Sequence, residues 1–380
     1  MKRIAVTHLI TDLAVGGAET MLSRLVSTMD RNAFDTRIIS LTGIDVIGEH
    51  MLKQGIPVTE LGAQRGSADP GIVVRLAWLL RKERPDILQT WMYHADLAGG
   101  LAARMTGRLP VVWNIRHSAL DPDRDSRKTM WTAKACARLS NLLPVRIVCC
   151  SEYSKHMHAR LGYNRDKMVV IPNGYDLDAF APDEDSRRMI REELGLSLDT
   201  RLVGLVARFN PHKDHHTFCR AAGILHRKMT DIRFVLCGEG VNRENRHLTA
   251  WIDEEGIGAV THLLDLRTDI PTIQAALDIA TSSSLGEAFS NAIAEAMTSG
   301  VPCVVTDAGD SAAIVGETGL VVPPGDAQAL AGALEKLLSL TPDERSALGA
   351  RARERIRDNY ELHTITQRYQ HMYRELAEAP

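Results

Sequence analysis

Short runs of β-branched and other apolar residues alternate with helical patterns along almost the whole chain. This alternation is typical of parallel sheets, because each strand needs a crossover helix before the chain can return to the same edge of the sheet. The predicted strands are 3–9, 36–41, 86–90, 111–115 and 146–150 in the first half, and 202–207, 233–237, 278–282 and 302–306 in the second. We therefore predict an α/β protein with a doubly wound sheet in each half.

The chain has 380 residues, more than one hydrophobic core usually organises. A turn signal, Pro172-Asn173-Gly174, follows a strand that ends at Ile171, and 182–199 is polar and charged. We therefore predict an N-terminal domain at 1–175 and a C-terminal domain at 176–358. Residues 359–380 form a last helix with one apolar stripe, which packs either on its own domain or across on the first.

Composition narrows the class of protein. The hydrophobic fraction of 44% and the charged fraction of 24% are those of a soluble globular protein. No apolar run has the length of a membrane span, and the N-terminus lacks the apolar stretch of a signal peptide, so we expect a cytoplasmic protein. The six cysteines form no CxxC pair, which indicates neither a disulfide framework nor a zinc site.

The two halves differ in charge. Residues 1–170 carry 24 basic and 16 acidic side chains, a balance of +8, which leaves −11 for the rest of a chain whose net charge is −3. Five of the basic residues lie within 127–146, which holds no acidic residue but contains Met130, Trp131 and Leu142. One interpretation is a basic amphipathic helix that lies on an anionic lipid surface. The other is an ordinary domain helix with a solvated cationic edge.

Residues 282–302 are the densest candidate site. A strand ends in a run of serines, a tight turn follows, and a helix begins near Ser290 and Asn291. The unpaired amides and the dipole at such a helix N-terminus favour an anion such as a diphosphate. Glu287 lies in the turn and Glu295 in the helix, where both carboxylates could accept hydrogen bonds from sugar hydroxyls. The alternative is that both are ordinary solvated glutamates.

A second candidate cluster follows the predicted strand 202–207. Arg208 and Lys213 lie in the loop at its C-terminal end, which is where open α/β sheets bind ligands. A guanidinium fork and an ammonium group together suit a diphosphate leaving group that no metal neutralises. Two exposed loop cations are the alternative. The nearby His212, His215 and His216 lie on a polar loop and are more typical of a solvated turn than of a metal site.

Glycine turns and one histidine complete the candidates. Gly16 and Gly17 join the first strand to the first helix, and Gly238 follows another strand; each permits close backbone approach to a ligand or merely reverses the chain. The pattern is not G-x-G-x-x-G, which disfavours a nicotinamide cofactor. His117 follows the strand 111–115, where it could bond a sugar hydroxyl or a developing oxyanion, or be structural.

Taken in order, these motifs resemble those of glycosyltransferase family 4. The resemblance rests on Gly16-Gly17-Ala18-Glu19, Ile171-Pro172-Asn173-Gly174, Arg208 with Lys213, Gly238-Glu239-Gly240, and Glu287 eight positions before Glu295. It covers almost the whole chain. It implies a GT-B fold, in which two Rossmann-like domains face each other across a cleft and the C-terminal helix returns to the first domain. It also implies retaining, metal-independent transfer from a nucleotide sugar, with no cofactor.

The resemblance also assigns roles. Glu295 would bind the ribose, Glu287 and His117 the transferred sugar, and Arg208 and Lys213 the diphosphate. The remaining donor-site residues would be Gly16, Gly17, Gly238, Leu266, Arg267, Ala288, Phe289, Ser290 and Asn291. Ala288 and Ala207 stand where the family usually has glycine. Each added methyl group narrows the backbone approach, and a positive φ at Ala288 would be strained.

We therefore expect a hexosyltransferase that moves a sugar, most simply from a UDP-sugar, to a lipid-linked or polysaccharide acceptor in cell-surface glycan biosynthesis. Its partners would be the donor, the acceptor and an anionic membrane surface met by the basic N-terminal domain at the inner face of the cell membrane, and not nucleic acid. Two alternatives are a UDP-sugar 2-epimerase of the same fold and an inactive GT-B-shaped protein that binds sugar or lipid.

Overall fold

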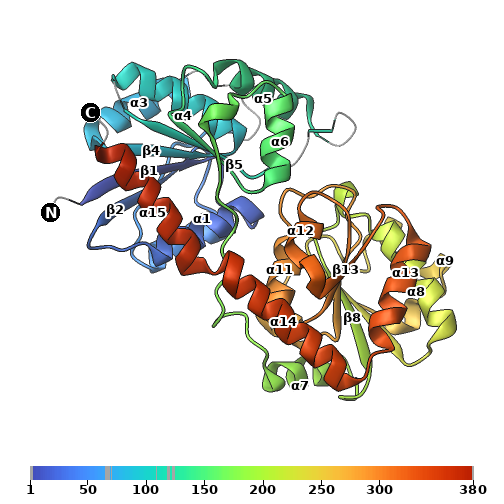
Figure 1. The fold of residues 1–380 in the computed structure, drawn as a ribbon. Helices are drawn as coiled ribbons and strands as arrows, with labels where there is room; N and C mark the ends of the chain where they lie inside the picture. The colour runs from blue at the N-terminus through green and yellow to red at the C-terminus, as the bar shows by residue number, and fades with distance from the viewer. Residues whose placement is uncertain are drawn as a thin grey trace. The chain divides into compact units, whose positions relative to one another are not determined.

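The computed structural model describes residues 3–64, 69, 71–107, 109–117, 120–121 and 125–378. The chain divides into two compact units. The first contains Met1–Gly174 together with Leu362–Pro380, and the second contains Tyr175–Glu361 (Figure 1). The sequence placed the divisions after residues 175 and 358. Each unit is an α/β sandwich, as the alternating pattern predicted.

A parallel sheet of seven strands forms the centre of the first unit, in the order β3-β2-β1-β4-β5-β6-β7. The order of the strands reverses between β1 and β4, although all strands stay parallel, and this makes the sheet doubly wound. The strands are β1 (Ile4–Ile10), β2 (Phe34–Ser40), β3 (Val58–Glu60), β4 (Ile87–Trp91), β5 (Val111–Ile115), β6 (Arg146–Cys149) and β7 (Met168–Val170).

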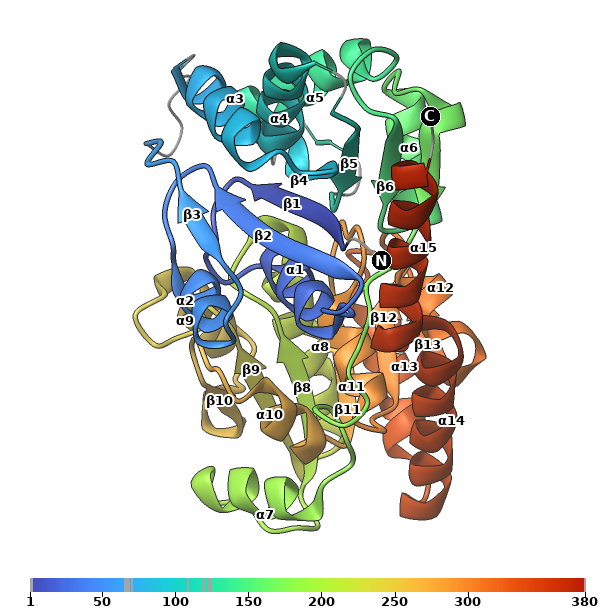
Figure 2. The ribbon, with the colours of Figure 1, turned by 90° about the vertical axis from the view of Figure 1, so that its left-hand side faces the viewer.

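Helices cover both faces of this sheet and bury a separate apolar cluster on each (Figure 2). On one face lie α1 (Gly17–Thr28), α2 (Val46–Lys53) and α15 (Leu362–Glu378). The other face is covered by α3 (Gly71–Glu83), α4 (Met92–Thr106) and α5 (Arg127–Leu139), and α6 (Glu152–Arg160) follows β6. The central strands β4 and β5 are buried along their whole length, as parallel strands covered on both faces usually are, whereas β2 and β3 nearer the edge carry exposed residues.

The second unit repeats this plan with six parallel strands in the order β10-β9-β8-β11-β12-β13. These are β8 (Arg201–Val206), β9 (Ile232–Cys237), β10 (Thr261–Leu263), β11 (Ile279–Ser282), β12 (Cys303–Thr306) and β13 (Gly319–Val322). The helices are α7 (Glu184–Glu193), α8 (His215–Lys228), α9 (Arg246–Glu254), α10 (Ile270–Ala276), α11 (Asn291–Thr298), α12 (Ser311–Val315), α13 (Ala327–Leu338) and α14 (Pro342–Tyr360). Its order reverses between β8 and β11.

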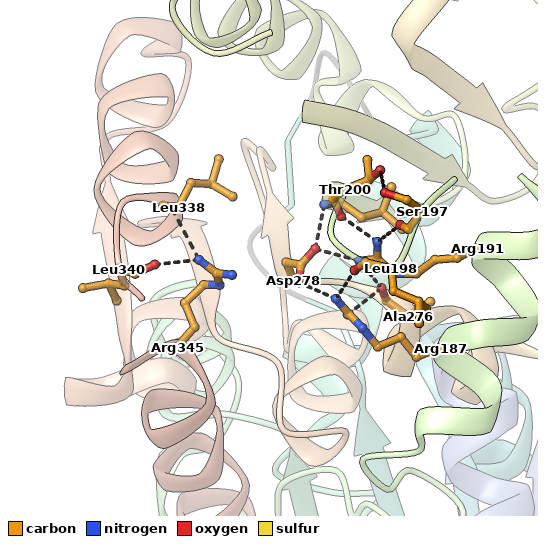
Figure 3. Close-up of polar contacts among 11 residues, drawn as sticks. Arg187, Arg191, Ser197, Leu198, Thr200, Ala276, Asp278, Leu338, Leu340 and Arg345 are labelled. Atoms are coloured by element: carbon orange, nitrogen blue, oxygen red, sulfur yellow. Dashed lines mark hydrogen bonds and ion pairs between the residues drawn. The ribbon is translucent and has the colours of Figure 1, made fainter. Parts of the chain in front are cut away.

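A buried ionic cluster fastens α7 to the second unit (Figure 3). Asp278, just before β11, accepts hydrogen bonds from Arg187 at 2.9 Å and from the fully buried Arg191 at 2.8 Å. The same carboxylate accepts the Leu202 amide at 2.8 Å. Because Asp278 pairs with both guanidinium groups and accepts a backbone N–H of β8, the buried charge of Arg191 has an ionic partner.

The last helix crosses back to the first unit, which confirms the fold that the resemblance implied. Its stripe of Ile365, Tyr369, Met372 and Tyr373 is buried in the core cluster with α1. The Thr366 hydroxyl lies 2.7 Å from that of Thr28 on α1. Before the crossing, the Tyr175 amide donates to the Tyr360 carbonyl at 2.9 Å, so the segments that enter and leave the second unit are tied together.

The remaining sequence expectations concern cysteines and membrane spans. All six cysteines are buried and unbonded, as expected from their scatter. Within the described ranges, no helix is both long and apolar enough to cross a membrane.

Candidate functional site

The predicted donor-site residues of the second unit gather at one edge of its sheet. Arg208 and Lys213 follow β8, Gly238 follows β9, Leu266 and Arg267 follow β10, and the segment 287–291 follows β11. All these strands are parallel neighbours, so their carboxyl ends share an edge. The reversal of strand order between β8 and β11 falls inside this set, and open α/β sheets bind ligands at such a point.

Lys213 and Glu287 form an ion pair across that reversal. The Lys213 side chain is 26% exposed and that of Glu287 only 9%. The Ser284 hydroxyl also donates to Glu287 Oε1, at 2.7 Å. A carboxylate with little access to water thus accepts hydrogen bonds from an ammonium group and a hydroxyl, both of which can exchange partners with a polar ligand.

The two loops that carry this pair are fastened to each other. The Leu285 amide donates to the His212 carbonyl at 2.8 Å. The Ser283 hydroxyl lies 2.9 Å from the carbonyl oxygens of both Lys213 and Asp214. The serine run that ends β11 therefore positions the pair, a role that the sequence analysis did not assign to it.

Arg208 is a second cation on the loop after β8 that carries Lys213. Its side chain is exposed, and it makes no hydrogen bond or ion pair with any residue that the structure describes. Lys213, in contrast, is already engaged by Glu287. An anionic ligand could therefore meet the Arg208 guanidinium without first breaking a protein contact.

Gly238 is required by the backbone around it. Its φ is +152°, and a Cβ atom there would lie within 3.0 Å of the backbone of Ala207. Its amide donates to the Asp265 carbonyl at 2.8 Å, and the Asp265 carboxylate accepts the Gly240 amide at 3.1 Å. The glycine thus lets the loops after β8, β9 and β10 approach closely, which is the structural interpretation of this motif.

The segment from Glu287 to Asn291 leads into α11. Its N-cap residue, Ser290, is 3% exposed and makes no side-chain cap, so the cap leaves the first amides of α11 to other partners. Phe289 stacks on Tyr175 with ring centroids 6.2 Å apart. Glu295 lies one turn into the helix and is 9% exposed. Ala288 does not have a positive φ, so its backbone is not strained in the way that the sequence analysis considered.

Leu266 and Arg267 differ in how they fit the predicted site. Leu266 is 54% exposed. The Arg267 guanidinium donates to Asp269 at 2.7 Å and to Glu193 of α7 at 2.6 Å, and these hydrogen bonds raise the pKa of Arg267. Its charge is already satisfied by two carboxylates, so its side chain is structural and only its backbone is left for a ligand.

In the first unit, Gly16 and Gly17 stand where α1 begins. Gly16 is the N-cap, in an extended conformation, and the Glu19 carboxylate lies against it so closely that a Cβ at residue 16 would collide with Oε2. The absent side chain of Gly16 therefore makes room for a carboxylate of this chain at the positive end of the helix. Both glycines follow β1, at the reversal of strand order in this sheet.

His117 follows β5 at the same edge of the first sheet. Its Nε2 lies 3.2 Å from Asp125 Oδ1, and its ring stands 5.8 Å from that of Tyr93. The other ring nitrogen, Nδ1, is buried without a hydrogen-bond partner in the described part of the chain. The side chain is 22% exposed, so a ligand would meet the ring while Asp125 fixes its orientation.

Arg116, the residue before His117, makes its contacts within the first unit. It donates to Asn114 at 2.8 Å and to Asn173 at 2.5 Å, contacts the Tyr369 hydroxyl, and lies over the Trp91 ring. This arginine joins β5, the Pro172-Asn173-Gly174 turn and α15. Arg116 is therefore a structural residue of the first unit.

These features define a GT-B protein: two doubly wound parallel sheets, with charged residues gathered at the carboxyl edge of the second. Residues 15–179 match the family model described as Glycosyltransferase Family 4, and residues 200–340 match that of Glycosyl transferases group 1. The chain belongs to the GT-B glycosyltransferases of family 4.

Relatives with assigned names agree with this family. The chain is 30% identical over 241 residues to UDP-Gal:alpha-D-GlcNAc-diphosphoundecaprenol alpha-1,3-galactosyltransferase of Escherichia coli. That match covers 62% of this chain and 61% of the relative. Putative glycosyltransferase EpsF of Bacillus subtilis is 26% identical over 336 residues, 80% of this chain and 79% of the relative. The chain thus spans less than two thirds of the first relative's length.

Solved structures share the fold. Anabaena HepE in complex with UDP and glucose superposes with a TM-score of 0.87 at 21% identity, over 98% of this chain and all of that one. Sucrose-phosphate synthase from Thermosynechococcus elongatus has a TM-score of 0.82 at 19% identity, over 98% and 99%.

Proposed function

We propose that the protein is a retaining glycosyltransferase that moves a hexosyl group from a UDP-sugar to a lipid-linked or polysaccharide acceptor in cell-surface glycan biosynthesis. The observation that carries the proposal is the pair of Lys213 with the nearly buried Glu287 at the strand-order reversal of the second sheet, with the exposed Arg208 on the same loop. Family membership supports the reaction class, and the relative with the undecaprenol-linked name supports the acceptor class.

In this proposal the donor displaces a contact that the protein makes with itself. The diphosphate takes the Lys213 ammonium and the Arg208 guanidinium, with the first amides of α11 as further donors. Glu287, released from Lys213 but still held by Ser284, accepts hydrogen bonds from the sugar hydroxyls. Glu295 accepts those of the ribose, and Gly238 and Leu266 line the nucleoside.

The chemical step requires no nucleophile from the protein. The acceptor oxygen forms a bond to the anomeric carbon on the face that the leaving group departs, and the bond from that carbon to the diphosphate oxygen breaks. The acceptor proton passes to the leaving diphosphate. Arg208 and Lys213 stabilise the charge that develops on the diphosphate, in place of a metal ion, and His117 orients the sugar through a hydrogen bond.

Binding of nucleotides tests the donor site. Titration calorimetry with UDP, GDP and ADP should give the tightest binding for UDP, and addition of EDTA should not weaken it. If none of the three binds, the donor-site assignment is wrong. A requirement for a divalent cation would contradict the metal-independent part of the proposal.

The reaction itself is tested with Glu287→Ala. This variant should fold normally by circular dichroism and lose transfer to the acceptor, because the sugar loses its carboxylate partner. Unchanged turnover would refute the role of Glu287. The anomeric configuration of the product, read by NMR coupling constants, checks retention. Formation of an epimer from the UDP-sugar alone would instead favour a 2-epimerase.

A lipid-linked acceptor would bring the reaction to the membrane surface. We therefore propose peripheral association with the inner face of the cell membrane, through the basic N-terminal domain. The exposed cations of α5 support this step.

A further inference from the structure

Two tryptophans of the first unit are largely exposed, although tryptophan is normally well buried. Trp78 on α3 is 63% exposed and Trp131 on α5 is 72% exposed. Their helices flank α4, which packs against both, and the three helices lie next to one another in both views of the fold (Figure 2). Helices in contact are about 8–10 Å apart, so the two tryptophans stand on helices whose axes are separated by roughly 20 Å.

The same surface carries further apolar side chains. Val74, four residues before Trp78, is 57% exposed, and on α4 Leu101 and Met105 are 39% and 44% exposed. The opposite sides of these helices bury their residues in the core cluster against the sheet. We call the outer surface of α3, α4 and α5 the tryptophan face. Its apolar groups are therefore additional to the core and remain exposed in the described part of this unit.

Positive charge surrounds these apolar groups. The three helices contain eight Lys and Arg residues and two acidic ones. Of the two acids, Asp96 is fully buried, and Glu83 is 16% exposed and lies 3.9 Å from an Arg37 nitrogen. The basic residues are Arg75, Arg81, Lys82, Arg104, Arg127, Lys128, Lys134 and Arg138. Lys82 lies over the Trp78 ring at 5.5 Å, so cationic and aromatic groups share one surface.

We propose that the tryptophan face docks on the surface of an anionic lipid bilayer, with Trp78 and Trp131 as interfacial anchors. Tryptophan is enriched at the level of lipid headgroups because its ring is apolar and its N–H is polar. Basic residues nearby are attracted by anionic headgroups. Two anchors on separate helices suit a broad, flat partner, whereas a peptide groove would need adjacent apolar walls. The inference rests on the proposed function, because a lipid-linked acceptor would lie in a bilayer that the enzyme must reach.

Vesicle co-sedimentation of the full chain tests this surface. Vesicles of phosphatidylcholine mixed with phosphatidylglycerol should bind the protein, vesicles of phosphatidylcholine alone should bind it weakly, and high salt should reduce binding by screening. The double variant Trp78→Ser, Trp131→Ser should bind about tenfold more weakly or worse, because the interfacial anchors are gone. Lys134→Glu with Arg138→Glu should lower both the binding and its salt dependence.

Matched controls lie elsewhere on the molecule. Val46 on α2 and Met189 on α7 are 60% and 54% exposed, and Val46→Ser with Met189→Ser should leave vesicle binding unchanged. Equal losses in this control and in the tryptophan variant would overturn the proposal. So would loss of a solution dimer, seen by light scattering, in the tryptophan variant of a protein that does not bind vesicles, since the face would then bind a second copy.

Nucleotide titration of the same variants separates this inference from the proposed function. The tryptophan variant should bind UDP as tightly as the unaltered protein does. Tryptophan-dependent vesicle binding by a protein that binds no nucleotide would support the docking surface and contradict the proposed function. UDP binding without any vesicle binding would support the donor site and contradict both the docking surface and the peripheral association.

Discussion

At the scale of single residues, the contact between Lys213 and Glu287 carries most of the functional argument. In the structure each side chain contacts the other. In the proposed reaction a group of the sugar diphosphate replaces that partner. Ser284 keeps Glu287 in place during that exchange. The ion pair is therefore a structural contact whose two members are also the groups that the proposed reaction requires.

Removal of Lys213 should weaken nucleotide binding. In Lys213→Ala the diphosphate loses a charge-assisted hydrogen bond, which is worth about 1.5–3 kcal/mol, so the Kd for UDP should rise about tenfold to a hundredfold. Calorimetric titration measures this. The control is Lys228→Ala, which breaks the exposed pair of Lys228 with Glu335 on the same unit and should leave the Kd unchanged. Equal affinities of Lys213→Ala and the unaltered protein would contradict the assignment.

Three buried histidines should make the protein sensitive to acid. Burial lowers the pKa of His8 to about 3 and that of His158 and His215 to about 4. In the unfolded chain these side chains bind protons near pH 6.5, so between pH 6.5 and 4 the unfolded state gains protons that the folded state does not. The free energy of unfolding should therefore fall as the pH falls through this window, by at most about 1.4 kcal/mol per pH unit for each histidine.

Urea unfolding at several pH values measures this slope. His158→Asn should reduce the slope of the unfolding free energy against pH by the contribution of one histidine. This holds whatever the substitution does to the absolute stability. His371→Asn is the control, because its side chain is 75% exposed and stays solvated in both states. An unchanged slope in His158→Asn would show that this histidine is not responsible.

Sequence reasoning could place residues that follow recognisable strands, but not contacts between residues that are far apart along the chain. Glu287, Arg208 and Lys213 follow strand ends that could be recognised by their apolar runs. The function of Arg116 depends on Asn173 and Tyr369, which lie 57 and 253 residues away. Asp125 could not be linked to His117 from sequence, since only the folded loop brings the two side chains within 3.2 Å.

At the scale of elements, Asp278 holds the second sheet and α7 together. Asp278→Ala would leave the buried Arg191 and the neighbouring Arg187 without their carboxylate, a loss that typically costs about 3–5 kcal/mol. Urea unfolding should detect this as a lower midpoint. Asp231→Ala breaks the exposed pair with Arg201 and should cost no more than about 1 kcal/mol. Similar losses in the two variants would mean that the buried cluster contributes no more than a surface pair.

The predicted strands were those with long apolar runs, and the missed ones were β3, β10 and β13. Each of these has three or four residues and lies at an edge of its sheet. An edge strand has one neighbour and is partly exposed, so its sequence lacks the continuous apolar run of a central parallel strand. The exposed Trp78 was missed for a related reason, because α3 has an ordinary apolar content and only the packing shows which side faces outwards.

At the scale of the whole molecule, α15 completes the first unit. Ile365, Tyr369, Met372 and Tyr373 are each at most 6% exposed, and burial of one such side chain contributes about 1.5–3 kcal/mol. Their sum is comparable with the total stability of a typical domain, which is about 5–15 kcal/mol. A chain that ends at Glu361 should therefore lose the folded first unit and keep the second.

Hydrogen exchange read by mass spectrometry measures this unit by unit. In the shortened chain, the amides of β1 and β4 should lose protection, while those of β8 and β11 keep it. Tyr373→Phe serves as a mild control, since it removes only the hydroxyl that contacts Gln89. Retained protection of β1 in the shortened chain would show that the first unit does not depend on its last helix.

The discontinuous first unit also has a consequence for biosynthesis. A ribosome delivers residues 1–174 first, but the helix that closes their core emerges only after the second unit has been made. At about 5–20 residues per second, the intervening 187 residues, Tyr175–Glu361, take on the order of 10–40 s to translate. The second unit can thus fold on the ribosome while part of the first unit's core remains open, until α15 has been made.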